Sequence, residues 1–112
     1  MSDTHDEMAF GPEMLLELEE VLRERATSTD PGSYTAKLLQ GDAARIRKKI
    51  GEEAFEVVLA SEREDKANLA AEVADLWFHS MLLLRKHGVD LTAVMGELAD
   101  RRGKRRAPKS GA

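Results

Sequence analysis

The amino-acid sequence predicts an all-α protein, and three observations support this fold class. Apolar residues recur at helical spacing along almost the whole chain. No segment alternates apolar and polar residues as a strand does, and β-branched residues are sparse. The 112 residues are 42% hydrophobic and 34% charged. This composition predicts one domain with a modest core and argues against wholesale disorder.

The first helix is expected to begin at Gly11 and Pro12, since proline suits the first helical turn. It should end near Ala26, before a segment from Thr27 to Ser33 that has the composition of a loop. The apolar residues of this helix repeat on one face, at Leu15, Leu18 and Leu22.

Two further helices are expected between the first loop and the middle of the chain. Ser33 can cap a short helix that runs through Leu39 and breaks at Gly41. Asp42 can cap a long helix that runs to about Ser61.

The second half of the chain repeats this pattern of cap, helix and stop. Arg63–Asp65 forms a polar turn in which Asp65 is the next cap. A helix should run from Lys66 to about His87, where Gly88 supplies the usual stop. Asp90 is expected to cap a final helix of about a dozen residues.

The charge is distributed unevenly, which helps to define the ends of the domain. The net charge is −4, but six basic residues and no acidic ones follow position 100, so residues 1–100 carry −10. We expect residues 1–10 to be a flexible acidic N-terminus, residues 11–102 to form the domain, and residues 103–112 to be a disordered basic tail.

Composition also excludes several classes of protein. The absence of cysteine excludes disulfides, thiolate metal sites and a cysteine nucleophile. No apolar run approaches the roughly 20 residues of a membrane span, and residues 1–10 are acidic rather than secretory. We therefore expect a cytoplasmic protein without membrane contact.

The most informative feature is a pair of carboxylate motifs, which comprise Glu52, Glu53, Glu56, Glu72 and Asp75. Carboxylates three residues apart on a helix project to one face. In helical projection Glu53 falls between Ile50 and Val57, and Glu72 stands among leucines. Buried charges need partners, and divalent cations with a preference for oxygen, Mg²⁺ or Mn²⁺, would supply them. An EExxE string alone is more often a solvated face, but the two apolar settings favour a metal site.

Basic and imidazole side chains accompany these motifs. Lys48 and Lys49 lie about one turn before Glu53, and Lys49 is the better placed to contact phosphate. The alternative is a solvated surface with the pairs Lys48–Glu52 and Lys49–Glu53. We interpret His79 as a hydrogen-bonded core residue rather than a metal ligand.

The helix expected over residues 66–87 is apolar on two opposite faces. One face carries Leu69, Leu76 and Leu83, and the other carries Val73, Trp77, Met81 and Leu84. A helix that is apolar on both sides is buried on both sides. Since a monomer of four helices rarely covers one helix so fully, we expect a homodimer.

Three segments together resemble the phosphoribosyl-ATP pyrophosphohydrolase family of the all-α (MazG-type) nucleoside triphosphate pyrophosphohydrolases. They are SYTAKLL at residues 33–39, KKIGEEA at residues 48–54 with Glu56, and the ExxD motif of Glu72 and Asp75 with His79. The two acidic motifs indicate only the superfamily, whereas SYTAKLL with KKIGEEA indicates the histidine-pathway member. The resemblance covers roughly residues 12–102.

The resemblance implies a four-helix-bundle-like fold completed by homodimerisation and an enzyme with a nucleotide substrate. The reaction would be hydrolysis of phosphoribosyl-ATP to phosphoribosyl-AMP and pyrophosphate, the second step of histidine biosynthesis, with Mg²⁺ as cofactor and Mn²⁺ as the alternative ion. The implied metal ligands are Glu53, Glu56, Glu72 and Asp75. Glu52 would position water or support the ligands, and Lys37, Lys48 and Lys49 would contact phosphate.

Two other functions remain as alternatives. One is a house-cleaning enzyme of the same superfamily that hydrolyses dNTPs, NTPs or damaged nucleotides. The other is a non-catalytic helical dimerisation module with a basic tail that binds nucleic acid. We do not expect nucleic acid as a partner, because the tail lacks aromatic residues that could stack on bases.

Overall fold

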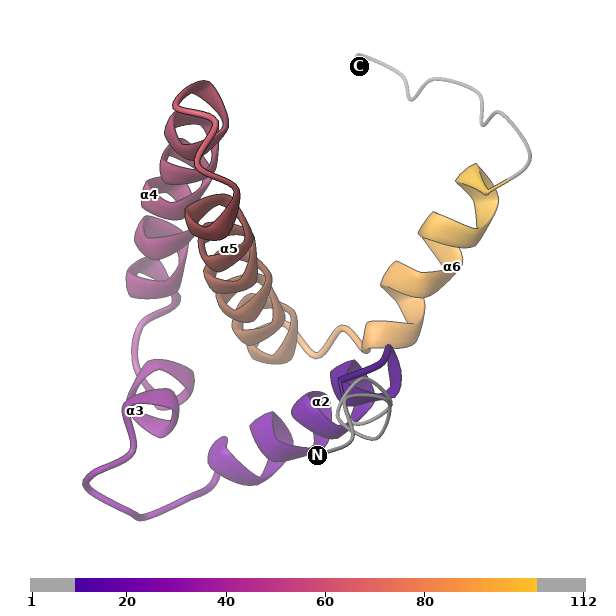
Figure 1. The fold of residues 1–112 in the computed structure, drawn as a ribbon. Coiled ribbons are helices and arrows are strands. Elements are labelled where there is room, and N and C mark those ends of the chain that lie inside the picture. The colour runs from indigo at the N-terminus through magenta and orange to yellow at the C-terminus, as the bar shows by residue number, and fades with distance from the viewer. Residues whose placement is uncertain (1–9, 103–112) are drawn as a thin grey trace, which may run out of the picture.

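A computed structural model of the chain describes residues 10–102, and it confirms the all-α fold class. Five helices and no strand occur within this range (Figure 1). Their bounds are α2 Glu13–Arg25, α3 Tyr34–Gln40, α4 Ala43–Glu62, α5 Lys66–Lys86 and α6 Leu91–Arg101. The expected flexible N-terminus and basic tail lie outside the described residues, apart from Phe10.

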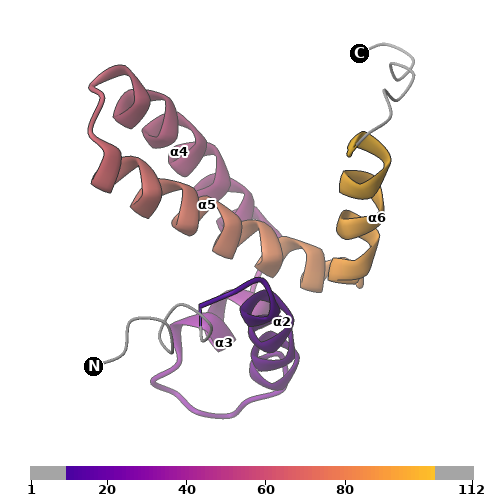
Figure 2. The ribbon, with the colours of Figure 1, turned by 45° about the vertical axis from the view of Figure 1, so that its right-hand side comes forward.

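The helices α4 and α5 form an antiparallel hairpin, and they lie side by side in both Figure 1 and Figure 2. Their turn ends α4 through hydrogen bonds from Glu64 N to Ser61 O and from Asp65 N to Ala60 O. Glu64 adopts a positive φ of 56° at a position that usually favours glycine. Asp65 then accepts a hydrogen bond from Asn68 N at 3.1 Å and so begins α5.

Three of the expected helix caps are confirmed. The side chain of Ser33 accepts from Ala36 N at 3.0 Å, that of Asp42 from Ala44 N at 2.9 Å, and that of Asp65 from Asn68 N. Gly88 ends α5 with a φ of 69°, in the left-handed region that glycine adopts at little cost.

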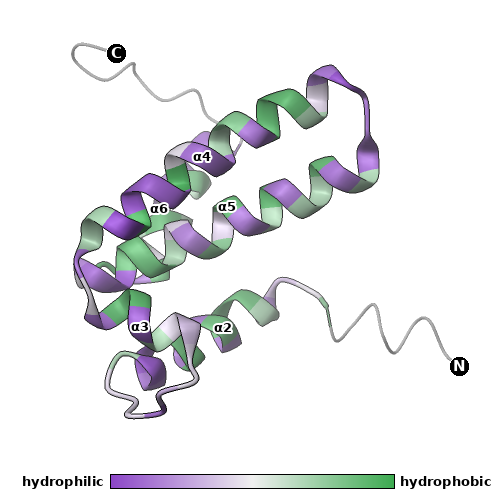
Figure 3. Ribbon diagram, turned by 90° about the vertical axis from the view of Figure 1, so that its left-hand side faces the viewer, coloured by the Kyte–Doolittle hydropathy of each residue, from purple (hydrophilic) through white to green (hydrophobic). Residues whose placement is uncertain are grey.

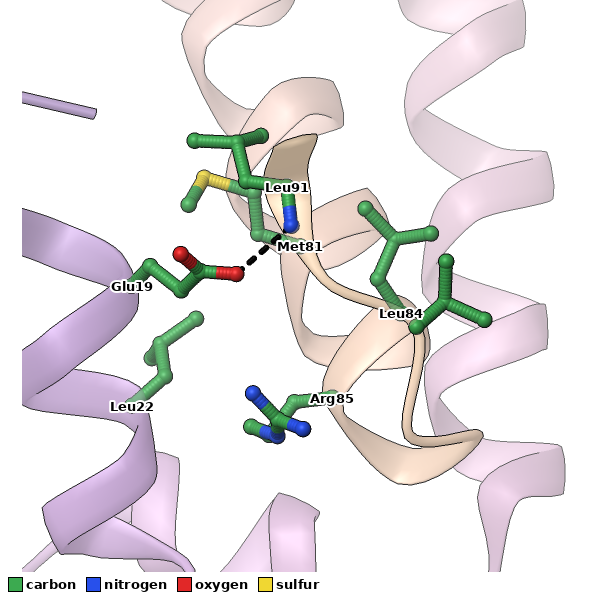
Figure 4. A pocket seen from close by; sticks show the side chains of 7 residues that line it. Glu19, Leu22, Met81, Leu84, Arg85 and Leu91 are labelled. Atoms are coloured by element: carbon green, nitrogen blue, oxygen red, sulfur yellow. Dashed lines mark hydrogen bonds between the residues drawn. The ribbon is translucent and has the colours of Figure 1, made fainter. Parts of the chain in front are cut away.

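Asp90 occupies the expected N-cap position of the last helix, but its side chain does not cap the helix. Asp90 stands immediately before α6, but its side chain accepts no hydrogen bond from the helix N-terminus. It pairs instead with Arg23 at 3.3 Å and Arg85 at 3.7 Å. The amide of Leu91 donates to Oε2 of Glu19 at 2.6 Å (Figure 4). A carboxylate from α2 therefore accepts the hydrogen bond of the first amide of α6, while the Asp90 side chain pairs with the two arginines.

The hydrophobic core lies where α2 and α3 pack against the start of α4 and the C-terminal half of α5. Its buried members are Leu22, Leu38, Leu39, Ile46, Met81, Leu82 and Leu91. The opposite end of the α4–α5 hairpin extends beyond this core (Figure 1). Hydrophilic and hydrophobic residues both occur along the whole length of α4 and α5 (Figure 3).

The last helix leaves the chain open on one side. α6 diverges from the hairpin at the C-terminal end of α5 (Figures 1 and 2). The radius of gyration is 16.2 Å, against about 13 Å for a compact chain of this length. Between α5 and α6 runs a groove of about 330 Å³ with an almost wholly apolar lining, which includes Trp77, Val94 and Leu98. None of the helices within residues 10–102 is long and apolar enough to span a bilayer.

Candidate active site

Glu53 is the buried carboxylate at the centre of the candidate site. It lies on the face of α4 that packs against α5, and only 9% of its surface is exposed. This burial confirms the helical projection, which placed Glu53 between Ile50 and Val57. Its Oε1 atom lies 2.8 Å from Nδ1 of His79, which is also buried.

The Oε1 atom of Glu53 receives no well-directed hydrogen bond among the described residues. The ring nitrogen of His79 that approaches it, Nδ1, lies 3.0 Å from the backbone oxygen of Asp75. A single N–H cannot point straight at both acceptors, and its direction favours the carbonyl. A buried carboxylate oxygen without a hydrogen bond is costly and suits a cation as partner.

His79 is fixed from three sides, which confirms its interpretation as a hydrogen-bonded core residue. The hydroxyl of Tyr34 lies 3.3 Å from Nε2, and the carbonyl of Asp75 lies 3.0 Å from Nδ1. The ring of Phe78 meets the imidazole edge-on, with the ring centroids 5.2 Å apart. These contacts leave the imidazole little freedom beside Glu53.

Three more carboxylates gather around Glu53 on the α4–α5 hairpin. Glu56 and Glu72 are equally far from the turn residue Glu64 along the chain, as are Glu53 and Asp75, so the members of each pair lie at a similar height on the hairpin. Partial burial raises the pKa of Glu72, and the negative charges of Glu56, Asp75 and Glu53 raise it further. The hairpin thus concentrates four acidic groups in one region.

The four carboxylates lie in one region of the hairpin, but their side chains do not point toward one common position. Glu56 and Asp75 are exposed and Glu72 is half-buried. Within residues 10–102, no three His, Asp or Glu side chains are arranged closely enough to hold a metal ion. The donor set nevertheless consists of carboxylate oxygens, the ligands that Mg²⁺ and Mn²⁺ prefer. Glu52 is exposed and is not among the groups that act on Glu72.

The predicted phosphate-binding lysines remain available. Lys37 and Lys48 are exposed, and Lys49 is half-buried. In the described part of the chain none of the three side chains forms an ion pair, so the pairs Lys48–Glu52 and Lys49–Glu53 are not formed. The structure brings none of these lysines into contact with the carboxylates.

Sequence reasoning gave no role to two residues that make long-range contacts in the structure, one of them at the site. Tyr34 was part of the SYTAKLL motif, but its contact with His79 joins residues 45 positions apart. Lys86 donates to the carbonyls of Leu39 and Gly41 and so satisfies the C-terminal end of α3. The sequence feature that could have pointed to Tyr34 is its position directly after the Ser33 cap, since the first residue of a capped helix has a defined orientation.

Comparison with known proteins identifies similar sequences over most of the chain. A sequence profile described as phosphoribosyl-ATP pyrophosphohydrolase matches residues 15–102. The chain is 44% identical over 92 residues to the phosphoribosyl-ATP pyrophosphatase of Nitrosospira multiformis, with 82% of this chain and 76% of the relative covered. It is 44% identical over 89 residues to the enzyme of the same name from Leptospira biflexa, with 80% and 97% covered.

A longer relative is also similar. The chain is 49% identical over 90 residues to the histidine biosynthesis bifunctional protein HisIE of Synechocystis, with 80% of this chain covered. The match spans only 42% of that bifunctional protein, so the chain corresponds to less than half of its length.

Proposed function

The chain belongs to the phosphoribosyl-ATP pyrophosphohydrolase family, and on this premise we propose that it hydrolyses phosphoribosyl-ATP to phosphoribosyl-AMP and pyrophosphate. The reaction cleaves a phosphoanhydride bond and is the second step of histidine biosynthesis. Relatives that carry this activity in their names are 40–44% identical over most of the chain. The observation that carries the proposal is the buried Glu53, whose Oε1 lacks a directed hydrogen bond and which acts on Glu72 together with Glu56 and Asp75.

Glu53, Glu56, Glu72 and Asp75 are the residues that would hold Mg²⁺, with Mn²⁺ as the alternative ion. Their fit rests on the orphaned oxygen of Glu53 and on the raised pKa of Glu72. Both observations report uncompensated negative charge, which a divalent cation offsets. When bound, the cation supplies charge neutralisation for the phosphates and lowers the pKa of a nearby water.

The remaining groups bind the substrate and handle the proton. Lys49, with Lys37 and Lys48, contributes positive charge toward the phosphates, because none of the three is neutralised by a carboxylate in the described part of the chain. Glu52 and Glu56 are exposed carboxylates beside the site. Glu52, which is not assigned to the cation, can accept the proton of the attacking water. Phosphoanhydride hydrolysis needs positioning and charge stabilisation more than covalent chemistry.

The protein acts as a homodimer in this proposal, and we place it in the cytoplasm, where a nucleotide intermediate of amino-acid synthesis is handled. The apolar groove between α5 and α6 supports the dimer. Trp77 in this groove is 57% exposed and Leu98 is 53% exposed. Large apolar side chains clustered on one surface mark an interaction site.

The test is pyrophosphate release by the purified protein with Mg²⁺. Phosphoribosyl-ATP should yield pyrophosphate, while dATP, dCTP and ATP should be nearly inert. Glu53→Gln should lower kcat by at least about 100-fold, because a central ligand loses its charge. Glu62→Gln at the exposed end of α4 is the matched control and should retain the wild-type rate.

The outcomes separate the alternatives. Pyrophosphate release from dNTPs with little from phosphoribosyl-ATP would establish the house-cleaning activity instead. Release from no nucleotide would favour the non-catalytic dimerisation module. Full activity of Glu53→Gln would refute the assignment of Glu53 to the metal.

A further inference from the structure

We propose that Tyr34 and His79 are positioning residues that hold the Glu53 carboxylate in place for the divalent cation, an inference that rests on the proposed function. The three side chains form a continuous series across three helices. The hydroxyl of Tyr34, on α3, lies 3.3 Å from Nε2 of His79 on α5, and Nδ1 of His79 lies 2.8 Å from Oε1 of Glu53 on α4.

The chemistry of the contacts assigns the proton on His79. The two atoms near Nδ1 are the carbonyl oxygen of Asp75 and a carboxylate oxygen of Glu53. A carbonyl and an ionised carboxylate can only accept, so Nδ1 carries the hydrogen. In the neutral imidazole Nε2 is then an acceptor, and the hydroxyl of Tyr34 donates to it. The two acceptors at Nδ1 set the tautomer in which an N–H faces Glu53, and the Tyr34 hydroxyl stabilises this tautomer by donating to Nε2.

Burial makes this arrangement rigid. The side chains of His79 and Glu53 are 7% and 11% exposed. The rings of Phe78 and Tyr34 meet the imidazole nearly at right angles, at 82° and 83°. The Nδ1–H of His79 points mainly at the Asp75 carbonyl, but Nδ1 still lies 2.8 Å from Oε1 of Glu53, so the fixed imidazole limits the directions in which Glu53 can turn. Polar side chains held against a ligating carboxylate orient it and tune its affinity for the metal.

The start of α3 explains how Tyr34 reaches this position. The Ser33 side chain accepts a hydrogen bond from Ala36 N at 3.0 Å and fixes the first turn of the helix. Lys86 donates to the carbonyls of Leu39 and Gly41 at the other end of α3, which ties this short helix to α5. Two anchors thus set the place of Tyr34 relative to His79, although Tyr34 itself is 49% exposed.

The experiment measures binding of Mn²⁺ alone to the metal-free protein by electron paramagnetic resonance, without substrate. Tyr34→Phe should weaken Mn²⁺ binding by about fivefold, the factor expected for one neutral hydrogen bond. His79→Leu should weaken it by about 10–100-fold. His79→Asn should recover most of the loss, because its amide keeps a donor near the position of Nδ1. His87→Asn on the exposed end of α5 is the matched control and should bind as the wild type does.

Melting temperatures and circular dichroism separate positioning from a purely structural role. A structural role predicts that Mn²⁺ affinity falls only with helicity and Tm, and that His79→Asn is no better than His79→Leu. That result would overturn the inference, as would wild-type Mn²⁺ affinity in both Tyr34→Phe and His79→Leu.

Failure of the proposed function would look different. In that case the wild type releases no pyrophosphate from phosphoribosyl-ATP. The graded loss of Mn²⁺ binding across the variants, measured without nucleotide, would still support the positioning of Glu53. Wild-type pyrophosphate release combined with unchanged Mn²⁺ binding in Tyr34→Phe and His79→Leu would refute the positioning and leave the proposed function standing.

Discussion

At the scale of single residues, the candidate site is a concentration of like charges partly withdrawn from water. Glu53 is buried, and Glu72 is half-buried within the field of Glu56 and Asp75. Neither burial nor repulsion stabilises the ionised form of a carboxyl group. These residues therefore lower the stability of the metal-free protein and make the site receptive to a cation.

Because of this repulsion at Glu72, the stability of the metal-free protein should depend measurably on pH. Because the folded-state pKa of Glu72 is raised, the folded protein binds more protons than the unfolded chain as Glu72 titrates. The contribution of Glu72 to stability is therefore present below the unfolded-state pKa and is lost as pH rises through the folded-state pKa. In chelator-treated protein, the Tm of the wild type should fall relative to that of Glu72→Gln as pH rises through this range.

The readout is the difference in Tm between the two proteins at each pH, because subtraction removes the effect of the other titrating groups. Glu62→Gln, the same exchange at an exposed position on the same hairpin, is measured beside Glu72→Gln as the matched substitution. A constant difference for Glu72→Gln would mean that Glu72 does not carry a raised pKa.

Sequence reasoning identified part of the site because helical periodicity reports burial directly. The position of Glu53 between Ile50 and Val57 was sufficient to predict its burial. Tyr34 could not be given a role in the same way, since its contact with His79 depends on how α3 packs against α5. The rotamers of Glu56 and Asp75 are set by solvent and charge, which no periodicity encodes.

At the scale of helices, local capping was predictable and long-range capping was not. Ser33, Asp42 and Asp65 each bond to an amide two or three residues ahead, so the sequence alone contains the interaction. The amide of Leu91 bonds to Glu19, 72 positions away. Asp90 had the right residue type at the right position, but arginines from α2 and α5 attract its side chain.

The two carboxylates near the start of α6 should therefore differ in their contribution to stability. Glu19→Ala removes the acceptor of the Leu91 amide and should lower the free energy of unfolding by about 1–2 kcal/mol. Asp90→Ala removes the exposed pair with Arg23 and a long 3.7 Å pair with the more buried Arg85, and should cost about 1 kcal/mol or less. Urea denaturation monitored by circular dichroism measures both values.

Glu19→Gln tests whether the hydrogen bond or the charge matters. The amide oxygen of glutamine can still accept from Leu91 N, so this variant should lie between Glu19→Ala and the wild type. If Asp90→Ala were the more destabilising substitution, Asp90 would be the cap in solution and Glu19 would not.

At the scale of the whole molecule, the protomer carries an apolar surface that it does not cover itself. The two-sided apolar pattern of residues 66–87 predicted that α5 needs a second partner, and Trp77 is indeed more than half exposed on it. The sequence could not show that α6 diverges from α5 and leaves a groove between them, because the angle between these helices depends on contacts such as Glu19 with Leu91.

Dimerisation through this groove predicts that an acidic substitution there separates the protomers. Leu98→Glu, on the groove, should weaken the dimer by at least about 100-fold, since a symmetric interface would bury two carboxylates. Leu16→Glu on α2 is a matched control, because Leu16 and Leu98 are both 53% exposed and Leu16 does not line the groove. Sedimentation equilibrium should give twice 12.4 kDa for the wild type and Leu16→Glu, and 12.4 kDa for Leu98→Glu at the same concentration.

The fluorescence of Trp77, the one tryptophan of the sequence, supplies an independent reading. Its emission should shift to longer wavelength when the wild type is diluted into the monomer range, and Leu98→Glu should show the shifted spectrum at all concentrations. A dimer that survives Leu98→Glu but is lost in Leu16→Glu would place the interface on α2 and leave the groove for another occupant.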